Sequence, residues 1–286
     1  MFWENIKEAI TSISSNKMRS LLTMLGIIIG ISSVIIITTI GGSIQSTLTA
    51  TMNSLGGNMV QAYVEARYPE NDEDWDTWEQ PEMTDSDYVT QDMIDGLIEK
   101  YPDEVTGVAA QNYLGSGTIK DDADSKNYAN VNIDGITPEY LEYMKLEMHA
   151  GRNLTKADNQ GKKRVCLIAD TMAERYFAGK DPIGETLSVA TSDGGIFDFV
   201  VVGVYVYNQA LFGKVDTSIP EKDRVTELMI PLQTCFKLQG TDRTGYDYFN
   251  LMIDPLADVN QATTDVLSYF DEMYANNKNF HVSAYN

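Results

Sequence analysis

The feature that most constrains this chain is a run of apolar residues from Leu21 to Ile40. It contains no charged residue, and no charge occurs anywhere between Ser20 and Val64. A helix of about 20 residues spans roughly 30 Å, the thickness of the hydrocarbon core of a bilayer. The Ser and Thr residues in the run can donate their hydroxyls to backbone carbonyls, so lipid tolerates them. The run predicts a transmembrane helix over residues 21–41, followed by a stalk over residues 42–58.

Basic residues near this run predict its orientation. Lys17 and Arg19 lie just before it, whereas the first basic residue after it is Arg67. The positive-inside rule then places the N-terminus in the cytoplasm and residues after about 45 outside. A cleaved signal peptide is the alternative, but its apolar region would be only about 7–15 residues long and would end at a small-residue cleavage site. The greater length of this run favours a retained membrane helix.

Residues 1–20 are expected to form a helix at the cytoplasmic surface of the membrane. Their apolar side chains recur at the 3.6-residue period of an amphipathic helix. Trp3 is also the type of residue that anchors at a membrane interface. An ordinary solubilising lead-in is the alternative interpretation. The apolar positions are Phe2, Ile6, Ala9, Ile10, Ile13 and Met18.

Small residues share one face within the apolar run. Gly26 and Gly30 form a G-x-x-x-G pair, which Thr23 and Ser33 extend. Removing side chains on one face lets a second helix approach closely, which is how helices gain contact in lipid. The pattern therefore predicts that this helix packs against other protein segments.

The remainder of the chain is strongly acidic. Residues 1–20 carry a net charge of +1, and the rest carries 18 basic and 40 acidic side chains, within a total net charge of −21. Such a surface repels nucleic acid and anionic headgroups, which excludes a nucleic-acid partner. The hydrophobic fraction of 43% is sufficient for a packed core. We therefore expect a folded domain outside the membrane.

Two strand–helix–strand patterns flank this domain. Each alone buries too little apolar surface, so we expect both to share one sheet. Between the first strand and helix, residues 65–87 are rich in Asp, Glu, Pro and Trp and are predicted to be an exposed loop. The first unit has strands over 59–64 and 105–112 and a helix over 90–100 with Thr90 as N-cap; the second has strands over 246–253 and 280–285 and a helix over 256–274.

Strand patterns dominate the region between these units. The predicted fold is therefore α+β, with an α/β part over residues 59–112 and 226–286 and an inserted β-rich subdomain over residues 113–225. The inserted strands are expected at 114–119, 128–133, 164–168, 186–189 and 197–207, with short helices at 138–144 and 171–177.

No residue pattern indicates catalysis or cofactor binding. Cys166 and Cys235 lie among apolar neighbours and are expected to be buried core residues, although a single bridge between them in an oxidising exterior is the alternative. His149 and His281 fit no catalytic or metal-ligand spacing, which argues against a hydrolase.

Two partial motifs are also rejected. Residues 130–135 resemble part of a calcium loop, but Leu141 stands where a bidentate Glu is needed. Gly179 and Lys180 have no upstream glycine at the spacing of a phosphate-binding loop. We therefore expect no enzyme activity, no cofactor, no metal site and no catalytic residue.

A series of segments is similar to one known family. Ile6–Gly30 combines an amphipathic lead-in, a basic Asn-Lys-Met-Arg step and the run Leu-Thr-Met-Leu-Gly-Ile-Ile-Ile-Gly. The series continues in order to about residue 232, and it resembles the permeases of MacB/FtsX-type ABC transporters. The later segments are Leu55–Asn58, Asp134–Tyr140, Gly151–Asp158, Asp181–Gly184, Phe199–Val204 and Met229–Leu232.

The resemblance implies both an architecture and a mechanism. In that family the external core domain comprises a porter-like α/β part, split in sequence, and an inserted β-rich part. A separate cytoplasmic ABC ATPase binds beneath a homodimer or heterodimer of permeases in the bacterial cell membrane. ATP-driven closure of the ATPase is transmitted along the first membrane helix to the external domain, a process called mechanotransmission. Such systems serve efflux or transport of peptides, lipoproteins or drugs, or envelope signalling.

The resemblance also implies where coupling would occur. We expect it in the cytoplasmic lead-in and on the small-residue face of the first membrane helix. The coupling residues on this interpretation are Arg19, Thr23, Gly26, Gly30 and Ser33.

The chain departs from the family pattern in one respect. Family members have three further membrane helices after the external domain, and this sequence ends at Asn286 before any of them. As given, it is expected not to form the complete permease. The alternative function is a singly anchored extracellular binding or adhesion module with no transport role. Co-purification with a cytoplasmic ATPase would distinguish the two.

Overall fold

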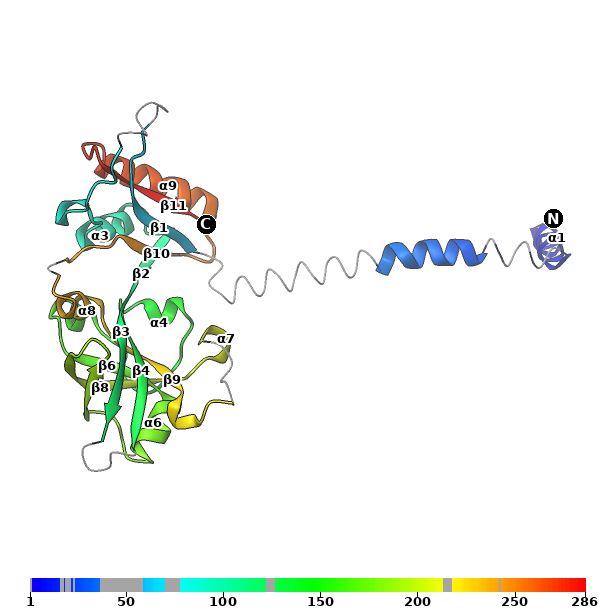
Figure 1. Cartoon of the computed structure of the whole chain (residues 1–286). Helices are drawn as coiled ribbons and strands as arrows, with labels where there is room; N and C mark the ends of the chain where they lie inside the picture. The colour runs from blue at the N-terminus through cyan, green and yellow to red at the C-terminus, as the bar shows by residue number, and fades with distance from the viewer. Residues whose placement is uncertain are drawn as a thin grey trace. The chain divides into compact units, whose positions relative to one another are not determined.

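The computed structural model of the chain comprises two compact units (Figure 1). We call residues 1–57 the N-terminal unit and residues 58–286 the core unit. The structure describes residues 2–15, 18, 22, 24–36, 59–69, 78–121, 127–212, 218–241 and 243–286.

The described part of the N-terminal unit is helical. It contains α1 (Phe2–Ser15) and a second helix over residues 24–36. Ser33 Oγ donates a hydrogen bond to the carbonyl of Ile29 at 2.7 Å, as expected for a hydroxyl in this run. Across the described ranges, no helix combines the length and apolarity needed to cross a membrane.

Several predictions for the N-terminal unit lie outside the described residues. These are the two ends of the expected membrane span, at Leu21 and residues 37–41, and the whole expected stalk over residues 42–58. Arg19 and Thr23 lie outside as well. Part of the predicted exposed loop, residues 70–77, is also outside.

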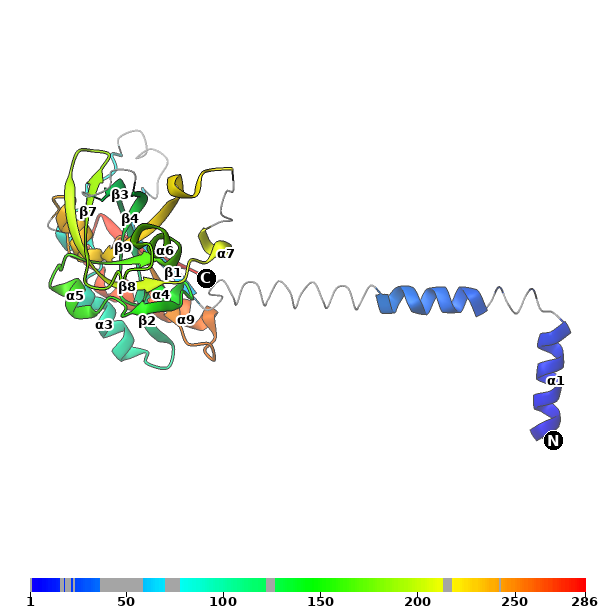
Figure 2. The same ribbon diagram turned by 90° about the horizontal axis from the view of Figure 1, so that it is seen from below.

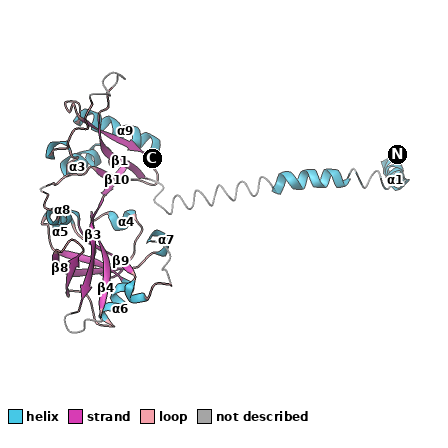
Figure 3. Ribbon diagram, in the orientation of Figure 1, coloured by secondary structure: helices cyan, strands magenta, loops and turns pink. Residues whose placement is uncertain are grey.

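The core unit contains a four-stranded sheet, of which β1 and β10 are labelled in Figure 3. Its order is β11–β1–β10–β2, and every neighbouring pair is antiparallel. Each of its two helices joins a pair of parallel strands with one strand between them, which is the split β-α-β arrangement. The two predicted strand–helix–strand units therefore share one sheet. The elements are β1 (Met59–Ala66), α3 (Gln91–Lys100), β2 (Val105–Ala109), β10 (Tyr248–Ile253), α9 (Val259–Met273) and β11 (Phe280–Tyr285).

Both helices of this sheet bury an apolar stripe. α9 packs against β11 and β1, and α3 packs against β2 (Figure 1). Buried residues recur three or four positions apart on each helix, as an amphipathic helix over a core requires. Thr90 caps α3 as predicted, its side chain accepting a hydrogen bond from the backbone N–H of Met93. Fully buried residues at this contact include Ile94, Leu97, Phe249, Val266 and Phe270.

A second sheet of seven strands closes on itself. Its order is β5–β8–β6–β9–β4–β3–β7, and β7 also pairs with β8. Six strands therefore form a ring, and β5 is attached to β8. Closure leaves few unpaired strand edges, which limits edge-to-edge association. The strands are β3 (Gln111–Lys120), β4 (Tyr128–Ile136), β5 (Met148–Gly151), β6 (Val165–Ala169), β7 (Thr186–Thr191), β8 (Ile196–Tyr205) and β9 (Val225–Pro231).

Apolar side chains from this sheet form a second core, and short helices surround it (Figure 2). Its fully buried members include Ile119, Ile133, Leu167, Phe199 and Leu228. The helices are α4 (Tyr140–Tyr143), α5 (Lys156–Gln160), α6 (Asp170–Phe177), α7 (Gln209–Phe212) and α8 (Leu232–Leu238), and two short 3-10 helices are η2 (Asp85–Asp87) and η3 (Glu221–Asp223).

One boundary differs from the sequence prediction. Residues 226–286 were expected in the α/β part, but β9 pairs in parallel with β4 and also contacts β6. Residues 225–231 therefore belong to the seven-stranded sheet. The last four residues of this strand are all buried, so this part of it has no alternating pattern to reveal its place. β5 and α8 were not predicted either.

The two sheets are joined by short connections and share one helix. Ala110 is the single residue between β2 and β3, and α8 directly follows β9. Phe236 of α8 is buried in the core of the four-stranded sheet, whereas Cys235 is buried in that of the seven-stranded sheet. Cys166 and Cys235 are both free thiols, so the predicted alternative of a bridge between them is wrong.

Candidate functional site

A buried carboxylate organises the segment around α5. Asp158 is 1% exposed and accepts hydrogen bonds from the backbone N–H and hydroxyl of Thr155, which caps the helix. Arg152 and Lys163 donate to the same carboxylate at 2.7 and 3.0 Å. Burial by itself raises the pKa of Asp158, but these hydrogen bonds outweigh burial and hold the pKa well below its usual range. The Gly-Arg-x-x-x-x-x-Asp element thus fixes the start of α5.

Glycines in the family-like segments permit close backbone contacts. A Cβ on Gly203 would lie 2.3 Å from the carbonyl oxygen of Arg152, and one on Gly135 would lie 2.3 Å from Cβ of Cys235. Gly151 has φ +72°, a conformation that side chains other than glycine rarely adopt. These residues pack β8 against the segment before α5 and β4 against α8. These glycines therefore permit close packing of the fold, and they carry no reactive group.

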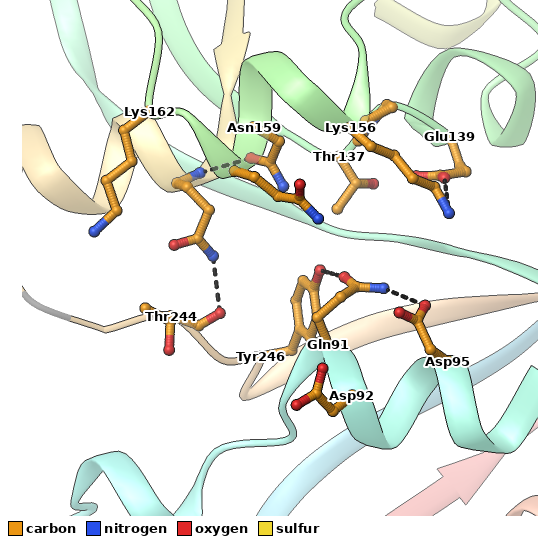
Figure 4. A pocket seen from close by; sticks show the side chains of 13 residues that line it. Gln91, Asp92, Asp95, Thr137, Glu139, Lys156, Asn159, Lys162, Thr244 and Tyr246 are labelled. Carbon is orange, nitrogen blue, oxygen red and sulfur yellow. Dashed lines mark hydrogen bonds and ion pairs between the residues drawn. The ribbon is translucent and has the colours of Figure 1, made fainter.

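A pocket of about 310 Å³ lies between helix α3 of the four-stranded sheet and the α4 and α5 segments of the seven-stranded sheet (Figure 4). Its lining is polar apart from a proline and the ring of a buried tyrosine. The lining residues are Gln91, Asp92, Asp95, Thr137, Pro138, Glu139, Lys156, Asn159, Gln160, Lys162, Gln233, Thr244 and Tyr246.

Hydrogen bonds order the wall that α3 provides. Tyr246 donates its hydroxyl to Gln91 Oε1, and Gln91 Nε2 donates to Asp95 Oδ1 at 2.9 Å (Figure 4). Tyr246 is 2% exposed, and burial raises its pKa, so the hydroxyl keeps its proton and remains a donor. This series of hydrogen bonds positions the Asp95 carboxylate at the pocket.

The opposite wall is ordered by backbone contacts. Asn159 Oδ1 accepts a hydrogen bond from the backbone N–H of Gln233 at 2.9 Å, which ties α5 to α8. Gln233 Nε2 donates to the carbonyl of Thr244 at 2.8 Å. Gln233 Oε1 is buried and has no hydrogen-bond partner among the described residues. An unpaired buried acceptor lowers the stability of a fold by about 1–3 kcal/mol, so a hydrogen-bond donor at this wall would be stabilising.

Charged side chains of both signs line the pocket. Asp92 and Asp95 lie on α3, whereas Lys156 and Lys162 lie at the two ends of α5 (Figure 4). Lys156 Nζ lies 3.7 Å from Glu139 Oε1, a loose and largely exposed ion pair. The charged and amide groups on both walls make the pocket suited to a polar ligand.

The structure describes only some of the residues predicted for helix packing and coupling. Gly26, Gly30 and Ser33 lie in the helix over residues 24–36, and a Cβ on either glycine would meet nothing within 4 Å. Arg19 and Thr23 lie outside the described residues. A coupling role for all five stays a prediction.

The residues considered for chemistry do not form a reactive site. Ser283 Oγ donates to Glu65 Oε2 at 2.7 Å and lies 3.3 Å from His281 Nε2. The serine thus stands between the acid and the histidine, whereas a nucleophilic relay requires the histidine in the middle. His149 lies on β5, in another sheet. No cluster of His, Cys, Asp and Glu able to hold a metal occurs within the ranges that the structure describes.

Sequence reasoning did not find the pocket. Its walls come from α3, the loop before α4, α5, α8 and the segment before β10, which are distant in sequence. Asp92, Lys162 and Gln233 belong to no recognised motif. The one available signal was the Gly151–Asp158 segment, which marks an ordered turn next to α5.

Comparison with curated proteins relates the chain to transporter permeases. It is 31% identical over 186 residues to an uncharacterized ABC transporter permease, YknZ, of Bacillus subtilis, which covers 64% of this chain and 43% of that protein. It is 25% identical over 221 residues to the macrolide export ATP-binding/permease protein MacB of Neisseria gonorrhoeae, which covers 75% of this chain and 30% of that protein. The chain therefore spans less than half the length of these relatives.

The fold and a family description agree with these relatives. The core resembles the crystal structure of the periplasmic region of MacB from Actinobacillus actinomycetemcomitans, with a TM-score of 0.51, 16% identity, and coverage of 81% of this chain and 91% of that one. At this identity the likeness shows the fold alone. Residues 20–269 match the family described as the MacB-like periplasmic core domain. The chain belongs to the MacB-like periplasmic core domain family.

Proposed function

We propose that this chain provides the extracytoplasmic core and first membrane helix of a MacB-like ABC transporter permease. It would couple a separate cytoplasmic ATPase to export or envelope signalling by mechanotransmission. The observation that carries the proposal is the continuity of the family match, which runs from residue 20, at the start of the apolar run, to residue 269 in α9. The relatives' names describe proteins of which this chain covers less than half.

The proposed arrangement places the N-terminus in the cytoplasm and the core unit outside a bacterial cell membrane. Its support is the absence of charge from Ser20 to Val64 and the pair Lys17 and Arg19 just before it. In the described helix over residues 24–36, every residue is exposed, and nine of the thirteen carry large apolar side chains. Lipid or neighbouring membrane helices would cover this surface.

The connectivity of the core unit is suited to receiving a mechanical displacement. β1 begins at Met59, so it is the first strand reached from the N-terminal unit. It pairs with β10 on one side and β11 on the other. A pull or rotation applied to β1 would therefore be shared by hydrogen bonds on both edges, and not lost at the rim of the sheet.

The proposal includes partners. The small-residue face at Gly26 and Gly30 would pack against other membrane helices, including those of a second permease subunit. ATP hydrolysis would occur on the ATPase subunit. Peptides, lipoproteins and drugs are the substrate classes that such systems serve.

Affinity purification of the full chain from its native cells, after mild crosslinking in membranes, tests this function. We expect an ATP-binding subunit of an ABC transporter among the crosslinked partners. A control chain with Ile28→Asp and Ile31→Asp, which cannot be retained in lipid, should recover none. Recovery of the unsubstituted chain without any ATPase would contradict the proposal and favour a singly anchored binding module.

A further inference from the structure

One wall of the pocket beside α3 and α5 carries two carboxylates, and the other carries two lysines and Glu139, which pairs loosely with Lys156. Asp92 and Asp95 are exposed carboxylates on α3, in the half of the core unit built on the four-stranded sheet. Lys156 and Lys162 stand at the ends of α5, in the other half (Figure 4). Among the described residues no ion pair joins these aspartates to these lysines, which leaves both sets available to a ligand with complementary charges.

Several polar groups of this pocket are not used internally. Among the described residues, neither Asp92 nor Lys162 takes part in an ion pair, and Asp95 is engaged only by the neutral amide of Gln91. Gln233 Oε1, buried at the same pocket, lacks a donor. The carboxylates of Asp92 and Asp95 are therefore available to a cation on the α3 wall, and the ammonium group of Lys162 is available to an anion on the opposite wall.

The position of Lys162 is maintained at a conformational cost. Its φ of +49° lies in the left-handed region, which costs a non-glycine residue about 1–2 kcal/mol. Its backbone N–H donates to the carbonyl of Asn159 at 3.1 Å, and Asn159 is itself fixed to Gln233. The turn after α5 thus holds a half-buried lysine at the rim of the pocket.

We propose that this pocket binds a dipolar ligand that carries an ammonium and a carboxylate group. The carboxylates of Asp92 and Asp95 would hold the ammonium, and Lys162, assisted by Lys156, would hold the carboxylate. The volume of about 310 Å³ is at the lower end of the range for small-molecule sites. A free amino acid and a short stretch of peptide with oppositely charged side chains both have this chemistry.

Binding at this position would link the two sheets. One set of contacts lies on α3 and the other beside α5, so a bound ligand would add a bridge to those already made by α8, the β2–β3 connection and the packing of α4 against β2. The ligand would favour the arrangement in which the pocket is formed. It would therefore raise the thermal stability of the core unit, and the rise would grow with the logarithm of ligand concentration once this exceeds the Kd.

Isothermal titration calorimetry of the full chain in detergent tests the site with two probes. Free L-lysine represents the amino-acid source, and N-acetyl-Lys-Glu-amide, which has no free termini, represents the peptide source. We expect at least one probe to bind and to raise the unfolding midpoint, while the uncharged N-acetyl-Gln-Gln-amide does neither. Binding of lysine alone would identify the ligand of the pocket as a free amino acid, and binding of the blocked dipeptide would identify it as a peptide segment.

Substitutions in the two walls make the assignment specific. Asp92→Asn with Asp95→Asn, or Lys162→Gln, should each weaken binding by about tenfold or more, since each removes a charge-assisted contact. Glu99→Gln on α3 and Lys180→Gln after α6 are matched controls, because both residues are exposed and neither lines the pocket. The proposal is overturned if neither charged probe binds at millimolar concentration, or if the wall and control variants bind equally well.

Discussion

The helix over residues 24–36 exposes its apolar side chains, whereas the core unit buries most of its own. All thirteen residues of that helix are exposed, among them Ile28 and Ile31 at 60% and 57%. The core unit buries its large apolar side chains in two clusters, one for each sheet. A single short helix is marginally stable in water, whereas a packed core is self-sufficient. The helix over residues 24–36 therefore requires lipid or protein to cover its apolar side chains, whereas the two clusters of the core unit are covered within the unit itself.

The largest effect should come from placing charge in the exposed helix. Ile28→Asp with Ile31→Asp puts two carboxylates where we propose hydrocarbon, at about 2.5–3.5 kcal/mol for each charge. The chain should pass from the carbonate-resistant membrane fraction to the soluble fraction. The thermal unfolding of the core unit should be unchanged. Ile28→Leu with Ile31→Leu is the control, and retention of the charged variant in the membrane fraction would contradict the comparison.

A Gly→Ala substitution should destabilise the core unit when made within it and have no effect on the core unit when made in the helix over residues 24–36. In the core unit, Gly203→Ala places a Cβ 2.3 Å from the carbonyl of Arg152 and 2.5 Å from Cε of Met148, so we expect a loss of about 3 kcal/mol. Gly26→Ala meets nothing within 4 Å and should leave urea unfolding of the core unit unchanged. Equal midpoints for both variants would show that the backbone contact at Gly203 is not tight.

Loss of the buried carboxylate at α5 should be the next largest effect. Asp158→Asn leaves Arg152 and Lys163 without their shared anion, and we expect a loss of about 2 kcal/mol at pH 7. The pKa of Asp158 is held below its unfolded value, so its contribution is present above the unfolded pKa and is lost as the pH falls through the folded pKa.

Urea unfolding between pH 7 and pH 2 measures this dependence. The unsubstituted chain should lose stability relative to Asp158→Asn as the solution is acidified. Parallel pH profiles for the two proteins would contradict the role of this carboxylate.

The contribution of Asp134 to the free energy of unfolding should change with pH in the opposite direction and by a smaller amount. Asp134 is 5% exposed, and burial raises its pKa, although a hydrogen bond from Gln111 partly opposes the rise. A raised folded pKa means that its contribution is present below the unfolded pKa and is lost as the pH rises through the folded pKa. Asp134→Asn should therefore gain about 1 kcal/mol over the unsubstituted chain between pH 4 and pH 7 in urea unfolding. A constant difference across this range would refute the assigned pKa direction.

Periodic patterns predicted those elements that have one buried and one exposed face. α3 and α9 show a 3.6-residue apolar stripe, and β7 alternates between buried and exposed residues. α8 was missed because Leu232 to Phe236 are all buried, so no polar face marks a helical period. The place of β9 was missed for the same reason: burial on both faces removes alternation.

The candidate pocket could not be predicted for a different reason. Asp92, Lys162 and Gln233 are separated by about 70 residues at each step and are brought together only by the packing of α3, α5 and α8. Polar lining residues are not distinguishable from surface residues in a single sequence. The Gly151–Asp158 pattern could be recognised, because its glycine and buried carboxylate satisfy a local turn.

The most direct test of the proposed membrane arrangement is labelling with a membrane-impermeant maleimide in intact bacterial protoplasts. Both native cysteines are buried and should not react while the core unit is folded. Leu256 is 96% exposed in the core unit, so Leu256→Cys should be labelled from outside. Lys7→Cys, in the N-terminal helix that we propose to be cytoplasmic, should be labelled only after the membrane is disrupted. Labelling of Lys7→Cys in intact protoplasts, or protection of Leu256→Cys, would contradict the arrangement.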